Sequence, residues 1–267
     1  MNHWLQTESG IWRLALWLGL LLLLLGLEQA LPRRGDPVKR GLRWPANFGL
    51  VVTSTLIAAL LPLTALGTSF WAEQHHWGLF HRLALPTWLT TSLAWLLLDG
   101  AIYWQHRWMH LVPALWRLHR VHHTDPFFDA TTAVRFHPAE IVLSILYKCV
   151  VIVALGAPPL AVFIFEVLLS SVALFNHANL RLPGDRWLRR VIVTPDQHRI
   201  HHSAHRAETD SNYANVLSLW DHLFRSYTPE PRDGQTTMQI GLTEFREDAS
   251  QKLLPLLTQP QKNSHRL

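Results

Sequence analysis

Residues 11–27 read IWRLALWLGLLLLLLGL and contain one charge, Arg13, and six consecutive leucines. At about 1.5 Å of rise per residue, about 20 apolar residues cross the hydrocarbon core of a bilayer. A cleavable signal peptide is the alternative, because it also joins a cation to an apolar run. This run is long, no basic segment precedes it, and Arg33 and Arg34 follow it. We therefore predict a retained membrane helix.

Further apolar segments follow along the 267-residue chain. The predicted spans are residues 11–30, 48–66, 87–104, 141–155 and 160–175. The last two are joined by Gly156-Ala157-Pro158-Pro159, which is too short for anything but adjacent antiparallel helices. Lys148 and Glu166 lie at similar depth in this hairpin, so we expect them to pair. The predicted fold class is all-α, a multi-spanning integral membrane protein with about four to five membrane helices.

The basic loop after the first span predicts the orientation of the chain. Residues 32–43 hold five cations, the pattern of a cytoplasmic membrane flank. Counting spans from there places the segments near Gln105 and His177 at the cytoplasmic face, in a helical cap. The net charge of +5 would suit a nucleic-acid binder, but these cations flank apolar spans and no nucleic-acid motif is visible. The single cysteine, Cys149, excludes a disulfide framework and a thiolate metal site.

Eight of the seventeen histidines fall into three short windows. Two windows follow the third predicted span, and the last window follows the fifth. Two windows repeat His-x-x-His-His, and the other is His-x-x-x-His. On a helix, offsets of three and four residues return to nearly the same face, so each window aims its imidazoles at one point. Eight nitrogen donors exceed the needs of one ion, which predicts a two-metal centre. The predicted ligands are His106, His110, His119, His122, His123, His198, His201 and His202.

Two histidines outside the windows are also candidates. His137 directly precedes the fourth span and His177 directly follows the fifth, so both lie at the same face. We predict His177 as a further metal ligand and His137 as a ligand or a hydrogen-bond partner of one.

Carboxylates and amides should accept the second ring N–H of metal-bound imidazoles. Asp125 and Glu140 flank the histidine windows, and Asp99 lies near the end of an apolar span, where an unpaired carboxylate is costly. We expect Asp99 to pair with one of the window histidines or with Arg107. The residues predicted to support the ligands are Asp99, Asn179, Asp196 and Asp221.

The location of these histidines indicates which metal they bind. Imidazole suits iron, zinc, copper and nickel, so spacing alone does not decide. At a membrane face the reachable substrate is a lipid, and breaking its inert C–H bonds requires a redox metal with O2, which excludes zinc. We therefore predict two iron ions, with O2 as co-substrate. Electrons must come from an external ferredoxin, cytochrome or reductase, because the chain has no dinucleotide loop or iron–sulfur cysteine set.

The order of the windows resembles the fatty acid hydroxylase / sterol desaturase superfamily. The resemblance covers about residues 99–224. Besides the windows, it includes residues 99–107, Phe136-His137-Pro138, Asn212-Tyr213 and residues 220–224. It implies an integral membrane, iron-dependent, O2-consuming enzyme that hydroxylates or desaturates sterols, fatty acyl chains or related lipids. It also implies that the eight window histidines bind iron, with His177 as an additional ligand. The chain departs from the family at Ala214 and at Arg225-Ser226, beyond the last window.

Three regions are predicted: N-terminal membrane helices with the basic loop (residues 1–86), a catalytic domain (87–227) and a polar tail (228–267) that folds loosely. The predicted function is a di-iron, O2-dependent oxidoreductase acting on a lipid. One alternative is a zinc-dependent membrane hydrolase, although that leaves most histidines idle and the chain lacks His-Glu-x-x-His. Another is a non-enzymatic metal carrier, which would place ionisable ligands within the spans.

Overall fold

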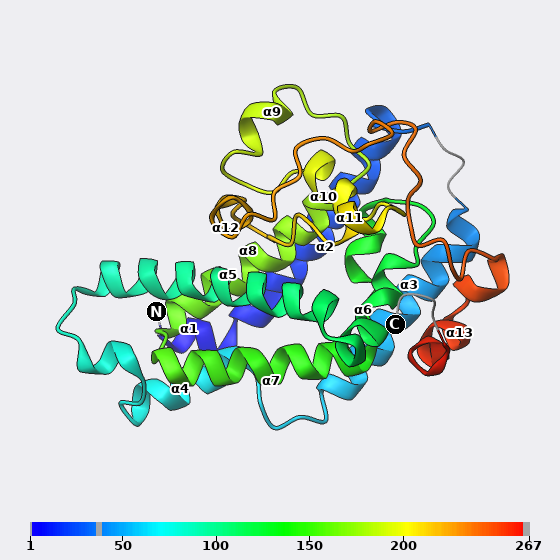
Figure 1. Cartoon of the computed structure of the whole chain (residues 1–267). Helices are drawn as coiled ribbons and strands as arrows, with labels where there is room; N and C mark the ends of the chain where they lie inside the picture. Colours follow the sequence, from blue (N-terminus) through cyan, green and yellow to red (C-terminus); the bar gives the residue numbers. More distant parts are fainter. Residues whose placement is uncertain (1, 36–38, 264–267) are drawn as a thin grey trace.

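The computed structural model describes residues 2–35 and 39–263, which form helices and, apart from isolated bridges, no strand. The all-α prediction is confirmed. The long helices form a bundle, with four short helices above it and α13 (Leu253–Thr258) to its right in the view of Figure 1. The four short helices are α9 (Asp185–Leu188), α10 (Pro195–His201), α11 (Arg206–Thr209) and α12 (Leu219–Leu223). The long helices are α2 (Ser9–Ala30), α3 (Arg40–Ala58), α5 (Thr87–Leu111), α7 (Pro138–Leu155) and α8 (Pro159–Asn176).

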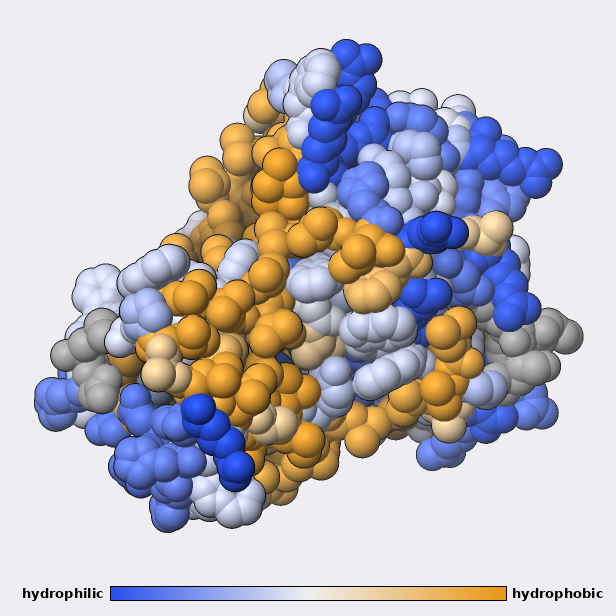
Figure 2. Space-filling view, turned by 60° about the vertical axis from the view of Figure 1, so that its left-hand side comes forward, coloured by the Kyte–Doolittle hydropathy of each residue, from blue (hydrophilic) through white to orange (hydrophobic). Residues whose placement is uncertain are grey.

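Three of the described helices are long and apolar enough to cross a membrane, namely α2, α7 and α8. They correspond to the spans predicted at 11–30, 141–155 and 160–175. Large side chains of α2, such as Leu14 and Leu22, are exposed. Figure 2 shows a broad apolar surface between hydrophilic ends. Such a surface is unfavourable in water and indicates contact with lipid chains.

The other two predicted spans differ from the helices found. The helix predicted at 48–66 begins earlier, at Arg40, and ends at Ala58. Its first turns bury polar side chains against the rest of the protein instead of facing lipid. The helix predicted at 87–104 continues to Leu111 and so carries two histidines beyond its apolar part. Both helices are long enough to cross a membrane, but neither is as apolar as α2, α7 and α8.

Helices α7 and α8 form the predicted hairpin. Gly156 ends α7 with φ +64°, a conformation that glycine adopts without strain, and Pro159 begins α8. Within the hairpin, Lys148 Nζ lies 3.4 Å from Glu166 Oε1, which confirms the expected ion pair. Arg13 of α2 joins the same carboxylate at 2.7 Å, a contact that the sequence did not predict.

Prolines start the short helices that hold five of the eight window histidines. Pro113 begins α6 (Pro113–His123) two residues after α5 ends, and Pro195 begins α10 (Pro195–His201). Proline at the first helical position costs no hydrogen bond, because the N–H there has no partner within the helix. The sharp link between α5 and α6 folds α6 back beside α5. Histidines near the ends of the two helices are thereby brought face to face.

The carboxyl-terminal segment is packed in its described part, so the prediction of a loose tail is wrong; residues 264–267 lie outside the described residues. Leucines of α13 (Leu253–Thr258) pack against α3 and Val121 of α6. Arg120 of α6 donates a hydrogen bond of 2.5 Å to the backbone oxygen of Gln259. The segment is polar on average, but its leucines lie on one helical face and supply the apolar contact.

Candidate metal centre

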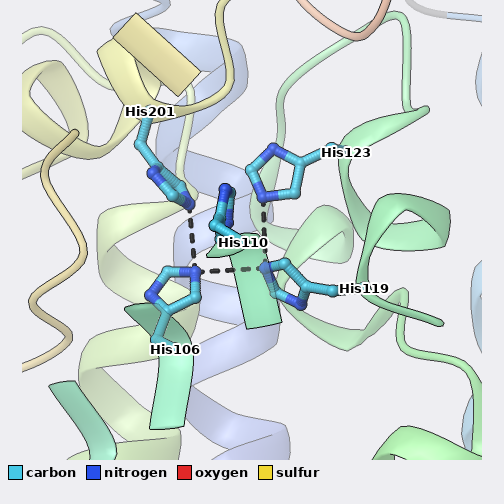
Figure 3. A group of neighbouring side chains, drawn as sticks. All are labelled: His106, His110, His119, His123 and His201. Carbon is cyan, nitrogen blue, oxygen red and sulfur yellow. Dashed lines mark hydrogen bonds between the residues drawn. The ribbon is translucent and has the colours of Figure 1, made fainter. Parts of the chain in front are cut away.

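Nine histidines form two adjacent groups, and within each group the ring nitrogens lie within 4.8 Å of one another. The first group, drawn in Figure 3, comes from α5, α6 and α10 and comprises His106, His110, His119, His123 and His201. The second comes from α6, the end of α8 and α10, and comprises His122, His177, His198 and His202. The structure thus brings together all eight window histidines and His177.

Each His-x-x-His-His window contributes to both groups. In α6 the outer histidines, His119 and His123, face the first group, while His122 faces the second. In the window that includes α10 the assignment is reversed, since only its middle histidine, His201, faces the first group. The rings of His123 and His202 stack with their centroids 4.5 Å apart and join the groups. Two windows about 80 residues apart in sequence therefore build two neighbouring centres.

Hydrogen bonds at Nδ1 show where lone pairs lie in the first group. His106 Nδ1 donates to the backbone oxygen of Tyr213 at 2.7 Å, and His201 Nδ1 donates to that of Ser211 at 2.6 Å. A carbonyl oxygen only accepts, so both Nδ1 atoms carry the proton and both Nε2 atoms carry a lone pair. These two Nε2 atoms are nevertheless 3.0 Å apart. Facing lone pairs repel, so a cation between them would stabilise the arrangement.

In the second group, too, Nε2 atoms of different histidines lie close together. His177 donates its Nδ1–H to the backbone oxygen of Ala173 at 2.7 Å, and its Nε2 lies 3.1 Å from Nε2 of both His122 and His198. The Nδ1 atoms of His122 and His198 are buried without a hydrogen-bond partner among the described residues. Neighbouring nitrogen ligands about 2.1 Å from one ion lie about 3 Å apart when they subtend a right angle. The donor set therefore fits a transition metal.

Burial keeps seven of the nine clustered imidazoles neutral. It lowers the pKa of His106 to about 3, with His119 adding to the effect, and it lowers the pKa of His177 to about 4. Burial and neighbouring imidazoles also hold the pKa well below its usual range for His122, His123, His198, His201 and His202. A neutral imidazole offers the lone pair that a metal requires. At neutral pH these rings therefore take up no second proton, so protonation does not relieve the repulsion between the opposed Nε2 atoms.

Two carboxylates contact the clustered histidines directly. Glu140 in the first turn of α7 lies 2.7 Å from Nδ1 of His119, and Asp210 lies 3.3 Å from Nδ1 of His110. Such contacts orient the ring and make its other nitrogen a stronger ligand. The sequence indicated Glu140 only as an acid near the windows and did not indicate Asp210. The pairing of each carboxylate with its particular histidine has no sequence signal, because each contact joins segments separated along the chain.

Asp99 and Asp221 fix the loop around the histidines rather than the histidines themselves. Asp99 accepts a hydrogen bond of 2.8 Å from the indole of Trp220, so the prediction that it pairs with a window histidine or Arg107 is wrong. Asp221 accepts one of 2.8 Å from the backbone N–H of Tyr213, whose carbonyl oxygen binds the first group. The predicted direct contact of Asp221 with a ligand is therefore also wrong, although the carboxylate holds a residue that makes one.

Asp196, Asn179 and His137 do not hydrogen-bond to the clustered histidines, contrary to prediction. Asp196 forms an ion pair with Arg33 at 3.0 Å, and Asn179 bonds to the backbone of the same loop. His137 lies outside both groups, and its Nε2 is 3.1 Å from the backbone oxygen of Leu257. These side chains connect the amino-terminal loop and the carboxyl-terminal segment to the core. The sequence did not reveal that either segment packs there.

A cavity of about 330 Å³ lies beside both histidine groups. His106, His119, His122, His177 and His198 form part of its wall. Phe136, also in the wall, stacks on His122 with ring centroids 4.3 Å apart. The remaining wall includes many apolar side chains, among them Ile102, Met109, Ile141, Leu169 and Leu174. The arrangement can hold an apolar chain against a pair of metal ions.

Comparison with known proteins gives one family and several relatives. The fatty acid hydroxylase family model matches residues 91–226. Alkylglycerol monooxygenase of Danio rerio is 34% identical over 69% of this chain and 41% of its own length. Ornithine lipid hydroxylase OlsE of Rhizobium tropici is 28% identical over 77% of this chain and 58% of its own. The chain thus spans about half the length of these relatives. No solved structure matches it.

Proposed function

Because this chain belongs to the fatty acid hydroxylase family, we propose that it is a lipid hydroxylase that uses O2 at a pair of iron ions. The observation that carries the proposal is the gathering of nine histidines in two adjacent groups beside an apolar cavity, with two bare Nε2 atoms opposed in the first group. Relatives named as a monooxygenase and a hydroxylase of lipids favour hydroxylation over desaturation.

The residues of the chain would hold the ions, orient the lipid and limit access of water. The nine clustered histidines would bind the metal through neutral imidazoles. Bound iron would supply the redox chemistry with O2 that breaks a C–H bond. The apolar wall, with Phe136 against His122, would keep the reacting carbon close and exclude water. Glu140 and the carbonyl oxygens of Tyr213 and Ser211 would fix the rings.

We place the histidine groups at the cytoplasmic face of the membrane, where an external electron donor would dock. The basic residues 32–43 and the apolar helices α2, α7 and α8 support this orientation. Cys149 is buried, so one introduced cysteine reports the topology cleanly. We expect Lys252→Cys, at an exposed position, to react with an impermeant maleimide only after the membrane is opened. Labelling of intact cells would contradict the orientation.

The metal content and the product test the proposal together. We expect the purified protein to bind about two iron ions per chain, because each histidine group would hold one ion. With iron, an electron donor and labelled O2, the lipid product should gain one labelled oxygen atom. Mass spectrometry of lipids from cells with and without the gene identifies the substrate. One zinc ion per chain with lipid cleavage would instead support a hydrolase.

Replacing Glu140 by glutamine is expected to weaken metal binding or activity about 10- to 100-fold, because the amide no longer provides an anionic acceptor for His119 Nδ1–H. Competition with a chelator measures the first effect, and the oxidation rate measures the second. Glu230→Gln is the matched control, since Glu230 is exposed and pairs with Arg189, far from the histidine groups in its contacts. Equal metal affinity in both variants would show that Glu140 does not support the ligand.

A further inference from the structure

An ion cluster lines the cavity at a distance from the histidines. It consists of Arg13, Lys148 and Glu166, and all three side chains are part of the cavity wall. Lys148 follows Glu140 by eight residues on α7, about 12 Å along the helix. Glu166 precedes His177 by eleven residues, about 16 Å along α8 and its C-cap. The cavity therefore connects a metal-binding end to a charged end.

The charges of this cluster do not balance. Glu166 lies 2.7 Å from Arg13 and 3.4 Å from Lys148, so one carboxylate serves two cations. No second carboxylate pairs with either cation among the described residues. The side chains of Lys148 and Glu166 are 14% and 12% exposed and that of Arg13 is 33% exposed, so water screens the charge of Lys148 poorly. A net charge between membrane helices is costly unless a counter-ion neutralises it.

We propose that Arg13 and Lys148 form a subsite for the carboxylate of a single-chain lipid, and this assignment of a substrate class rests on the proposed function. A carboxylate supplies the one missing negative charge, and a guanidinium can bind it with two parallel hydrogen bonds. At about 330 Å³ the cavity is near the lower limit for ligand pockets, which favours one chain over a two-chain phospholipid. The chain of the lipid runs from this subsite to the histidines. The oxidised carbon therefore lies about 12–16 Å from the carboxylate.

Competition binding tests the subsite without requiring turnover. Purified protein in detergent binds a spin-labelled stearate, and palmitate, hexadecanol and hexadecyl phosphate compete for it at a pH where the acid is ionised. We expect palmitate to bind about tenfold or more tightly than hexadecanol, because only palmitate brings a charge to the cations. Equal affinity of acid and alcohol would overturn the subsite. Tighter binding of the phosphate than of palmitate would overturn the assignment of a carboxylate.

Two variants of opposite sign separate an anion site from a structural ion pair. We expect Lys148→Gln to weaken palmitate binding about tenfold and to leave hexadecanol unchanged. Glu166→Gln should strengthen palmitate binding, because it releases both cations from their protein partner. A purely structural cluster predicts that both variants lower the melting temperature and weaken every ligand, which would overturn the proposal.

The comparison of acid and alcohol on the unaltered protein decides the question even when a variant does not fold. It also separates the two proposals. Charge-dependent binding without oxidation of the bound lipid contradicts only the proposed function. Oxidation of a lipid whose binding ignores charge contradicts only the subsite.

Discussion

The His122→Ala variant is expected to lose most of the metal of the second histidine group and to oxidise lipid more than about a hundredfold more slowly. His122 Nε2 lies 3.1 Å from His177 Nε2, and its ring is fully buried against Phe136. Outer contacts of a metal ligand are worth about 10–100-fold, and a ligand itself should be worth more. Elemental analysis measures the iron per chain, and product formation with labelled O2 measures the rate.

His137→Ala is the matched control for this prediction. His137 lies at the start of α7 near the same end of the bundle but belongs to neither histidine group. Its loss removes the contact with Leu257, so we expect a small decrease in stability and full iron content. Both variants should insert into the membrane, because neither position lies within α2, α7 or α8. His122 is in α6, and His137 precedes the first residue of α7. Full iron retention in His122→Ala would contradict its role as a ligand.

The sequence predicted the gathering of the histidines because their spacing matches the helical repeat. Offsets of three and four residues placed His119, His122 and His123 near one face, and the end of a span placed His177 at the same level. The sequence could not assign individual histidines to one group or the other. That division depends on how α6 and α10 approach each other, which is a property of the tertiary packing.

The contacts around the ligands were the least predictable part of the site. His106 and His201 bond to backbone oxygens of Tyr213 and Ser211, and a carbonyl group is present in every residue, so no residue type marks it. Asn212, between them, has φ +51° and bonds through its side chain to the backbone oxygen of Thr228 at 2.9 Å. The loop conformation therefore rests on contacts from later in the chain.

Apolar runs in the sequence predicted the membrane helices, but the position of a charged residue did not predict its role. The basic loop predicted Arg43 as a cation at the membrane surface, yet its side chain is fully buried. The guanidinium lies 2.6 Å from Asp125 and 2.8 Å from Asp129. Asp125 comes two residues after His123, so this network anchors the end of the histidine helix. The sequence showed the charges but not the distance between them.

Replacing Arg43 by methionine is expected to destabilise the protein by about 3–5 kcal/mol, because it leaves the carboxylates of Asp125 and Asp129 buried without their ion-pair partner. Denaturant unfolding in detergent measures the loss. Lys39→Met is the matched control: Lys39 pairs with Asp248 while both are more than half exposed, so we expect less than about 1 kcal/mol. Adding Asp125→Asn and Asp129→Asn to Arg43→Met should recover part of the stability, since the penalty comes from the uncompensated carboxylates. If Arg43→Met costs no more than Lys39→Met, the buried network does not hold the end of the histidine helix.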